Sequence, residues 1–246
     1  MRACSFSQKA RITFMWQCVI AALFGAMPLE AHAYLLTNTF TFSVNRTIPD
    51  DDQTGFADTR IISSSLTNLH KLQVALNILG GYNGDLYAYL YFTNSIQQSS
   101  AFTVLLNRPG RTATDEFGYG DSGMNIVFGN DAPNGDIHTY RTVIDPQGGV
   151  LTGLWQPDAR NVHPAFSLDS VARTADMSGF TGLNPSGSWT LFMADNSSFG
   201  VATLQSWQVN LIAVPEPKSV SLAAFSLLLL LAFYRTRVGK HLASRK

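Results

Sequence analysis

Cysteine is almost absent from this chain. Its two cysteines, Cys4 and Cys18, lie close to the N-terminus, in a segment with the features of an export signal. Once that signal is removed, residues 34–213 contain no cysteine, which excludes a disulfide framework, a zinc site with thiolate ligands and a cysteine nucleophile. A domain of 180 residues is long enough to be stabilised by its core alone.

Basic residues are scarce in the same central segment. Residues 34–213 contain 8 Lys and Arg against 15 Asp and Glu, a net charge of −7, although the whole chain is formally neutral. Nucleic-acid binding needs clustered Lys and Arg that neutralise phosphates, so the acidic balance argues against a nucleic-acid partner. It fits an exported, soluble domain with carboxylates to spare for a hard cation.

Sustained helical periodicity is missing as well, since no window of residues 34–213 has an apolar stripe with a 3.6-residue period. Short alternating runs occur instead, separated by turn signals such as Asn83-Gly84. In residues 85–92, apolar side chains alternate with three tyrosines. Alternation with a period of two is typical of strands. We therefore predict one all-β domain at 34–213, an antiparallel sandwich or barrel.

The N-terminal segment has its features in the order of a secretory signal peptide. Three basic residues precede the largely apolar stretch 12–27, and Ala31 and Ala33 then form the small-x-small pattern of a cleavage site. We predict that residues 1–33 are a signal peptide, read by the Sec export machinery and removed after Ala33.

The sequence Gly-Asp-Ser-Gly at positions 120–123 matches the surroundings of the nucleophile in chymotrypsin-like proteases. That chemistry also needs a His base and an orienting Asp. None of His70, His138 and His163 stands in a motif of that kind. The same four residues are a common turn composition. We therefore expect a turn at 120–123 and predict that the domain is not an enzyme.

Asp50, Asp51 and Asp52 form an acidic run. Carboxylates are hard oxygen ligands, so the run is a candidate calcium site, and calcium is the only cofactor that the sequence suggests. It is not an EF-hand loop, because the twelfth position is Ile61 instead of Glu. A solvated turn explains the crowded carboxylates as well. Both interpretations stay open.

Tyr87, Tyr89 and Tyr91 share one face of the strand expected at 85–92. Aromatic side chains in such a row can stack on sugar rings, which would make the face a carbohydrate platform. Packing under a loop is the alternative, and aromatics at strand spacing usually serve it. Trp189 and Trp207 lie on alternating strands, and we expect them in the core.

Six stretches occur in a family-like order: residues 48–55, 84–90, 105–110, 125–132, 186–196 and 203–209. Their motifs, from an Ile-Pro-Asp entry through Gly-Asp-Leu to a closing Leu-x-Ser-Trp, resemble the P domain (P/Homo B) of proprotein convertases and bacterial subtilisin-like proteases. The resemblance implies a jelly-roll-like antiparallel β-sandwich of about eight strands. In that family the domain is not catalytic and packs beside a subtilisin-like domain. The segment 129–165 has no counterpart in the family pattern.

The C-terminal segment 214–246 also has an ordered set of features. Pro215, Glu216 and Pro217 precede an apolar stretch at 220–234, and a basic tail begins with Arg235 and Arg237. This order resembles the PEP-CTERM sorting signal of Gram-negative bacteria that make exopolysaccharide. The resemblance implies processing by exosortase, a membrane protease.

The apolar stretch 220–234 is short for a permanent anchor. As a helix it would cover about 22 Å at ~1.5 Å per residue, against roughly 30 Å of hydrocarbon. The basic tail should stay cytoplasmic, which leaves the β domain on the periplasmic side. A transient hold in the inner membrane suits this length, and a plain tail anchor is the alternative.

These observations together predict an exported, non-enzymatic surface or extracellular-matrix protein in an exopolysaccharide or biofilm context. It would be held in the inner membrane and then reach the cell surface or the medium. Two alternatives remain. One is an accessory module for a separate subtilisin-like protease, and the other is a calcium-dependent carbohydrate-binding module.

Overall fold

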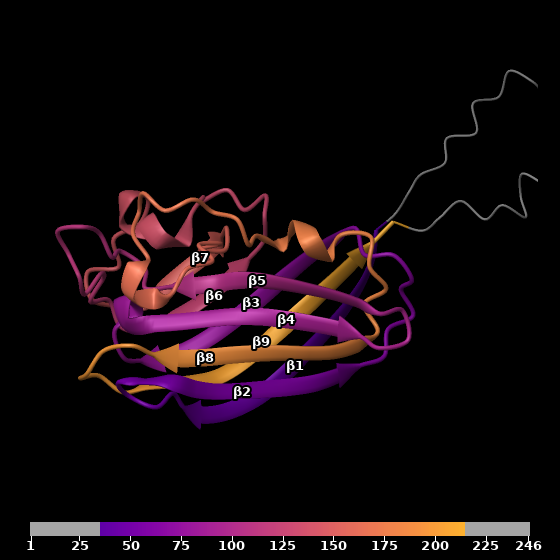
Figure 1. The fold of residues 1–246 in the computed structure, drawn as a ribbon, viewed down its shortest axis with the longest axis horizontal. Coiled ribbons are helices and arrows are strands. Elements are labelled where there is room, and N and C mark those ends of the chain that lie inside the picture. The colour runs from indigo at the N-terminus through magenta and orange to yellow at the C-terminus, as the bar shows by residue number, and fades with distance from the viewer. Residues whose placement is uncertain (1–34, 215–246) are drawn as a thin grey trace, which may run out of the picture. The chain divides into compact units, whose positions relative to one another are not determined.

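The computed structural model describes residues 35–214, whose strands form a β-sandwich (Figure 1). The strands, in chain order, are β1 (Leu36–Thr47), β2 (Asp52–Ile62), β3 (Lys71–Gly80), β4 (Leu86–Asn94), β5 (Ser99–Asn107), β6 (Met124–Phe128), β7 (Leu151–Trp155), β8 (Gly187–Asp195) and β9 (Ala202–Ala213). Four short 3-10 helices interrupt the loops: η1 (Asn83–Asp85), η2 (Ile137–Thr142), η3 (Pro164–Phe166) and η4 (Met177–Phe180).

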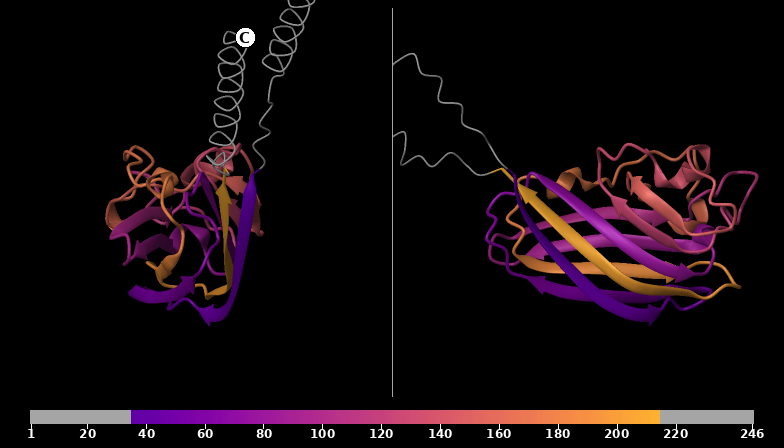
Figure 2. Two further views of the ribbon diagram at one scale, coloured as in Figure 1. Left: turned by 90° about the vertical axis from the view of Figure 1, so that its right-hand side faces the viewer. Right: turned by 180° about the vertical axis from the view of Figure 1, so that it is seen from behind.

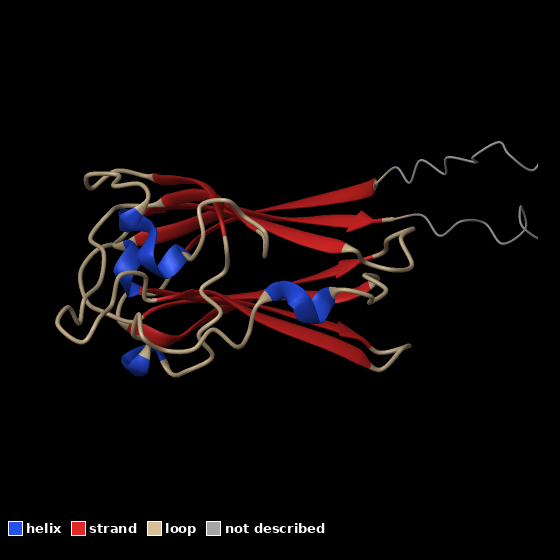
Figure 3. Cartoon of the chain, turned by 90° about the horizontal axis from the view of Figure 1, so that it is seen from above, coloured by secondary structure: helices blue, strands red, loops and turns tan. Residues whose placement is uncertain are grey.

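The strands form two sheets that face each other. The first has the order β1-β9-β3-β6-β7 and the second the order β2-β8-β4-β5. Seen from above, the two layers of strands are separate, and the view from behind shows the long strands β1, β9 and β3 of the first sheet (Figures 2 and 3). The predicted all-β sandwich is confirmed, with nine strands in place of about eight.

The predicted antiparallel pairing holds except at one edge of the first sheet. Strands β6 and β7 pair in parallel, with Met124 opposite Leu151 and Phe128 opposite Trp155. A parallel pair needs a long crossover, and residues 129–150 supply it with η2 on the way. Part of the segment 129–165 that the family pattern left unassigned is therefore a crossover and an edge strand.

The core lies between the sheets and follows from the alternation read in the sequence. In β3 every second residue is buried, from Leu72 to Ile78. In β8 the inward positions are Trp189, Leu191 and Met193. Trp189 and Trp207 are both buried, as expected. Large apolar side chains on the inner faces thus account for the stability that this domain must obtain without disulfides.

The outer edge of the second sheet is covered by irregular chain. Backbone hydrogen bonds join Ala159 N to Val104 O at 2.9 Å, Asp158 N to Leu105 O at 3.1 Å, and Val104 N to Ala175 O at 3.1 Å. Residues 156–176 therefore run along β5 and satisfy its free edge. An exposed edge strand is a template for aggregation, and this covering removes it.

A polar contact joins the two sheets near β1 and β2. Trp207 of β9 donates its indole Nε1–H to Asp58 Oδ2 of β2 at 2.6 Å, and Arg60 donates to the same carboxylate oxygen at 2.9 Å. The indole is thereby satisfied although it is buried. This contact fixes β2 against the opposite sheet.

Gly55 allows β2 to approach β8. The register between the two strands shifts between Asp52 and Phe56, and Gly55 has a φ of +48° there. A Cβ at this position would collide with the carbonyl oxygen of Met193. We predict that Gly55→Ala lowers the free energy of unfolding by about 3 kcal/mol, from left-handed strain plus overpacking.

Urea unfolding measures this effect, and Gly135→Ala is the matched control. Gly135 has a φ of +75°, but no atom lies within 4 Å of a Cβ there. Gly135→Ala should lower the free energy of unfolding by only about 1 kcal/mol, from the conformational strain alone. Equal losses in the two variants would show that the close approach to β8 is unimportant.

Candidate functional site

The predicted processing residues lie outside the part of the chain that the structure describes. These are Ala31, Ala33, Pro215, Glu216, Pro217, Arg235 and Arg237, together with the apolar stretch 220–234. Within residues 35–214, no helix is long and apolar enough to cross a membrane. The export and sorting assignments stay predictions.

Asp121 of the protease-like motif is a buried hydrogen-bond acceptor. Its carboxylate accepts from Tyr140 Oη at 2.6 Å, Arg141 Nε at 2.8 Å and Gly148 N at 2.8 Å. Burial raises the pKa of this carboxyl, but the hydrogen bonds from Arg141, Tyr140 and Gly148 outweigh burial and lower the pKa overall. The motif thus anchors the crossover to β7.

No hydrogen bond within residues 35–214 joins the Ser122 hydroxyl to a histidine. The buried histidine of the domain, His138, has both ring nitrogens engaged elsewhere. Nδ1 lies 2.8 Å from Asp158 Oδ2, and Nε2 lies 2.9 Å from the carbonyl oxygen of Arg111. His138 therefore holds loops together, and its ring offers no nitrogen to a neighbouring nucleophile.

An aromatic cluster, hereafter the aromatic floor, lies on the outer face of the second sheet. It consists of Tyr87 and Tyr89 of β4, Phe102 of β5 and Phe192 of β8, all half-buried. The rings of Tyr89 and Phe192 are stacked, with centroids 4.8 Å apart and planes inclined by 10°. Tyr91 shares the strand and the face but not this cluster, and it is 41% exposed.

The aromatic floor borders a groove of about 390 Å³. Tyr87, Tyr89 and Phe192 line its base, and the turn with Asn161 and His163 forms a wall. Gln53 and Asn196 also line the groove. His163 is fixed in the turn, because its Nδ1 accepts from Ala165 N at 3.2 Å. The groove thus combines aromatic side chains at its base with polar side chains around it.

A second polar feature lies at the end of β8. Asp195 is fully buried, and its backbone pairs with Asp52 on one side and Leu86 on the other. The neighbouring Asp85 is 4% exposed, with Oδ1 3.5 Å from Arg108 Nη2. Of these two buried carboxylates, Asp85 contacts the buried Arg108, and the charge of Arg108 also acts on Asp195.

The pKa values of both carboxyls are raised. Burial raises the pKa of Asp85 to about 6, with Arg108 opposing and Asp50 adding to the shift. Burial also raises the pKa of Asp195 to about 7, where a hydrogen bond from Ser197 N opposes the shift and the charges of Asp85 and Asp50 increase it. The negative charge in this corner of the domain exceeds what Arg108 balances.

The predicted calcium run divides in the structure. Asp50 and Asp51 are exposed in the turn before β2, and Asp51 has a φ of +51°. Asp52 accepts from the Thr54 hydroxyl at 2.6 Å and from Thr54 N at 2.8 Å, and these bonds lower its pKa. Within residues 35–214, no three His, Cys, Asp or Glu side chains are grouped to hold a metal ion. Calcium at the run itself stays a prediction.

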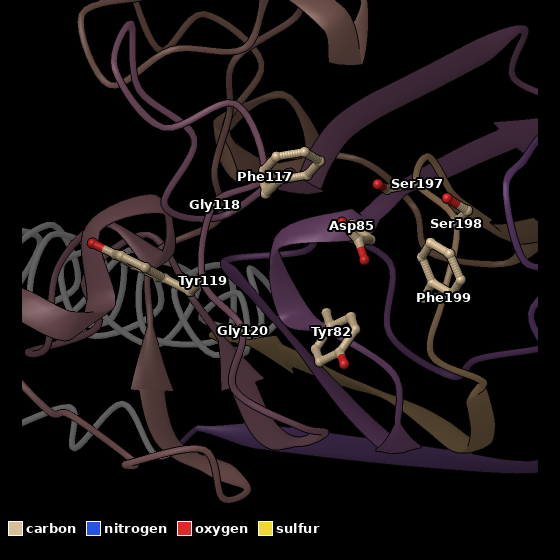
Figure 4. Close-up of a pocket in the computed structure, with 9 residues that line it drawn as sticks. All are labelled: Tyr82, Asp85, Phe117, Gly118, Tyr119, Gly120, Ser197, Ser198 and Phe199. Carbon is tan, nitrogen blue, oxygen red and sulfur yellow. The ribbon is translucent and has the colours of Figure 1, made fainter.

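A pocket of about 610 Å³, hereafter the end pocket, opens beside Asp85. Figure 4 shows Asp85 with Tyr82 and Phe199 on one side and Ser197 and Ser198 nearby. Three of its aromatic side chains are exposed: Tyr82 by 45%, Phe117 by 63% and Phe199 by 78%. The end pocket therefore has an apolar rim and a carboxylate in its wall.

Sequence reasoning missed the pairing of Asp85 with Asp195. The signal for Asp195 was available, because it continues the inward positions of Trp189, Leu191 and Met193 along β8. A charged residue at an apolar inward position is unusual and needs a partner. The proximity of Asp85 follows from the β4–β8 register, which the sequence alone does not specify.

No protein-family profile and no curated protein sequence matches the chain. Among solved structures, a chain in the crystal structure of the Aeromonas sobria serine protease in complex with its chaperone is similar, with a TM-score of 0.40 and 14% identity. The similarity covers 80% of this chain and 29% of that one. A structure of the Aeromonas sobria serine protease gives a TM-score of 0.38 and 14% identity, covering 79% of this chain and 30% of that one. The chain thus spans less than a third of the chains it resembles.

The raised pKa of Asp195 makes stability depend on pH. An unfolded carboxyl titrates near the model value of 3.8, whereas the folded one titrates near 7. Between these values the unfolded state loses its proton first, so rising pH favours unfolding until the folded carboxyl ionises as well. We expect Asp195→Asn, measured in chelator, to gain stability over the parent as the pH rises from about 4 to 7.

Urea midpoints at pH 4, 6 and 8 measure this difference, with Asp131→Asn as the control. Asp131 pairs with Lys71 at 2.7 Å, and this hydrogen bond lowers its pKa. The control should therefore lose a little stability at higher pH. A difference between Asp195→Asn and the parent that does not vary with pH would contradict the assignment.

Proposed function

We propose that residues 34–213 form a non-enzymatic polysaccharide-binding module of an exported surface or extracellular-matrix protein. The observation that carries the proposal is the aromatic floor, where Tyr89 and Phe192 present stacked rings at the base of a groove. Sugar rings have apolar C–H faces that pack on aromatic rings, and their hydroxyls need polar partners at the sides. The exposed side chains of Gln53, Asn161 and His163 supply such partners.

The contacts of the other candidate residues support a binding role over a catalytic one. Asp121 is engaged by Tyr140, Arg141 and Gly148, and His138 by Asp158 and a backbone carbonyl. These bonds leave neither side chain available as a base for Ser122. The proposal that the domain is not an enzyme rests on this.

The proposed route to the cell surface rests on the sequence. Residues 1–33 direct Sec export, and the segment 220–234 holds the protein in the inner membrane with the domain on the periplasmic side. An exosortase-type protease then recognises Pro215, Glu216 and Pro217 and releases the protein to the cell surface or the medium. Bacteria with this sorting signal make exopolysaccharide, and we propose that the aromatic floor binds a polysaccharide of this kind.

The apolar rim of the end pocket favours a second candidate function. Phe117 and Phe199 are largely exposed, as are the neighbouring Leu79 and Val201. Exposed apolar patches are typical of protein–protein contact sites. A module that accompanies a separate subtilisin-like protease, in the way the P-domain resemblance implies, would use this surface.

Removing a ring from the aromatic floor tests the polysaccharide proposal. Tyr89→Ala abolishes the stack on Phe192, so we expect affinity for the host exopolysaccharide to fall about tenfold. Tyr91→Ala is the matched control, because it removes an exposed tyrosine from the same face of β4 outside the groove. Affinity electrophoresis in gels with and without the polysaccharide measures both variants.

Equal affinities for the two variants, or no retardation of the parent protein, would rule out the aromatic floor as the binding surface. Co-purification of a subtilisin-like protease with the parent, combined with no retardation, would favour the second candidate instead.

Changing the sorting motif tests the proposed route separately. In a host with an exosortase, replacing Pro215, Glu216 and Pro217 by alanine should leave the full-length protein in the inner membrane. The parent and a Ser219→Ala control should be shortened at the C-terminus and released. Fractionation with mass spectrometry of the mature termini measures this, and identical processing of all three proteins would refute it.

A further inference from the structure

An excess of negative charge lies where β8 ends beside the first residues of β2 and β4. Asp195 ends β8, Asp85 precedes β4, and the register places Asp195 opposite Leu86. Asp50 is two residues before β2, whose first residue pairs with Asp195. Arg108 is the cation that contacts Asp85. Three carboxylates and one guanidinium leave the corner with two uncompensated charges when all are ionised.

Two buried oxygen atoms in this corner lack a hydrogen-bond donor. Asp195 Oδ1 accepts from Ser197 N at 3.2 Å, but Oδ2 is buried without a partner. Asn196 Oδ1 is likewise buried without a partner, while its Nδ2 donates to the carbonyl oxygen of Asp85 at 3.3 Å. Buried oxygens are rarely left unpaired. These two atoms, one carboxylate oxygen and one amide oxygen on consecutive residues, lie near the carboxylate of Asp85 and point to a cation.

We propose that Asp85, Asp195 and Asn196 form a calcium site, with Asp50 contributing from the turn before β2. Calcium takes six to eight oxygen ligands and accepts carboxylates, amide oxygens and water together. The unpaired Oδ2 of Asp195 and Oδ1 of Asn196 are oxygens of these kinds. The raised pKa values of Asp85 and Asp195 agree with a corner that favours added positive charge.

In the described part of the chain, no three His, Cys, Asp or Glu side chains are grouped to hold a metal ion. The proposed donor set does not need such a group. Two carboxylates and one amide oxygen form the fixed part. Asp50 is exposed in the turn before β2, where its charge acts on both carboxyls, and water would fill the remaining positions.

The end pocket gives an ion access to this corner from solvent. Asp85 is in its wall, and the hydroxyl-bearing residues Ser197 and Ser198 lie beside it (Figure 4). The pocket, at about 610 Å³, is far larger than a hydrated ion. This assignment shares only Asp50 with the run 50–52 that the sequence suggested, so the two sites predict different variants.

Calcium titration of the purified full chain tests the site. After treatment with chelator and dialysis, calorimetry should detect one calcium ion per chain, and the melting temperature should rise with calcium concentration. Asp195→Asn should weaken calcium binding by at least about tenfold, because it removes a charged ligand. Magnesium should bind less well, since it demands a tighter octahedral geometry.

Asp51→Asn is the matched control, with the same loss of charge in the exposed part of the acidic run. It should change the affinity by less than about threefold, as expected for a charge that is not a ligand. Circular dichroism in chelator establishes that Asp195→Asn is folded, so that lost binding is not lost structure. The proposal is overturned if the parent binds no calcium, if Asp195→Asn binds as well as the parent, or if Asp51→Asn loses as much affinity as Asp195→Asn.

Discussion

The alternation of side chains along β4 and β8 is the constraint on which the rest of the structure depends. Inward positions such as Leu191 and Phe92 build the core, and outward positions such as Tyr89 and Phe192 build the aromatic floor. A slip of one residue would exchange the two sets. Gly55 lies at the register shift between β2 and β8, where the absence of a Cβ lets the two strands approach.

The same alternation explains the polar corner, which is the region where Asp195, Asp85 and Arg108 lie close together. At the end of β8 it delivers Asp195 to an inward position, where a carboxylate loses its hydration. Arg108 compensates part of the charge, and Ser197 N satisfies one carboxylate oxygen. Nothing among the described residues donates to the other oxygen. Natural cores avoid this arrangement unless a function requires it, which favours a cation beside Asp195.

How much the sequence predicted depended on whether the signal was local. Strands β3 and β4 and the burial of Trp189 and Trp207 followed from alternation and side-chain size, which are local properties. The parallel pairing of β6 with β7 did not, because β7 has five residues and lies beyond a crossover with no regular pattern. The Asp85–Asp195 corner was missed for the same reason, since strand register sets it and the aspartates stand 110 positions apart in the sequence. The aromatic floor lay between these cases: the sequence aligned the tyrosines, but Phe192 and the wall at Asn161 came from tertiary structure.

Asn196 connects the two candidate sites. Its backbone N–H and side-chain Nδ2 both donate to the carbonyl oxygen of Asp85, its Oδ1 is buried without a donor, and the residue lines the groove over the aromatic floor. A cation held by Asp195 and Asn196 would therefore restrict a side chain that lines the groove. Binding of a ligand reduces the conformational entropy of the side chains that it contacts. If calcium already holds Asn196 in place, less entropy is lost when a sugar binds, so the affinity for the sugar would increase without a contact between calcium and sugar. Calcium dependence of polysaccharide binding would then arise from the shared residue, and it would vanish in Asp195→Asn while the stack of Tyr89 on Phe192 stayed intact.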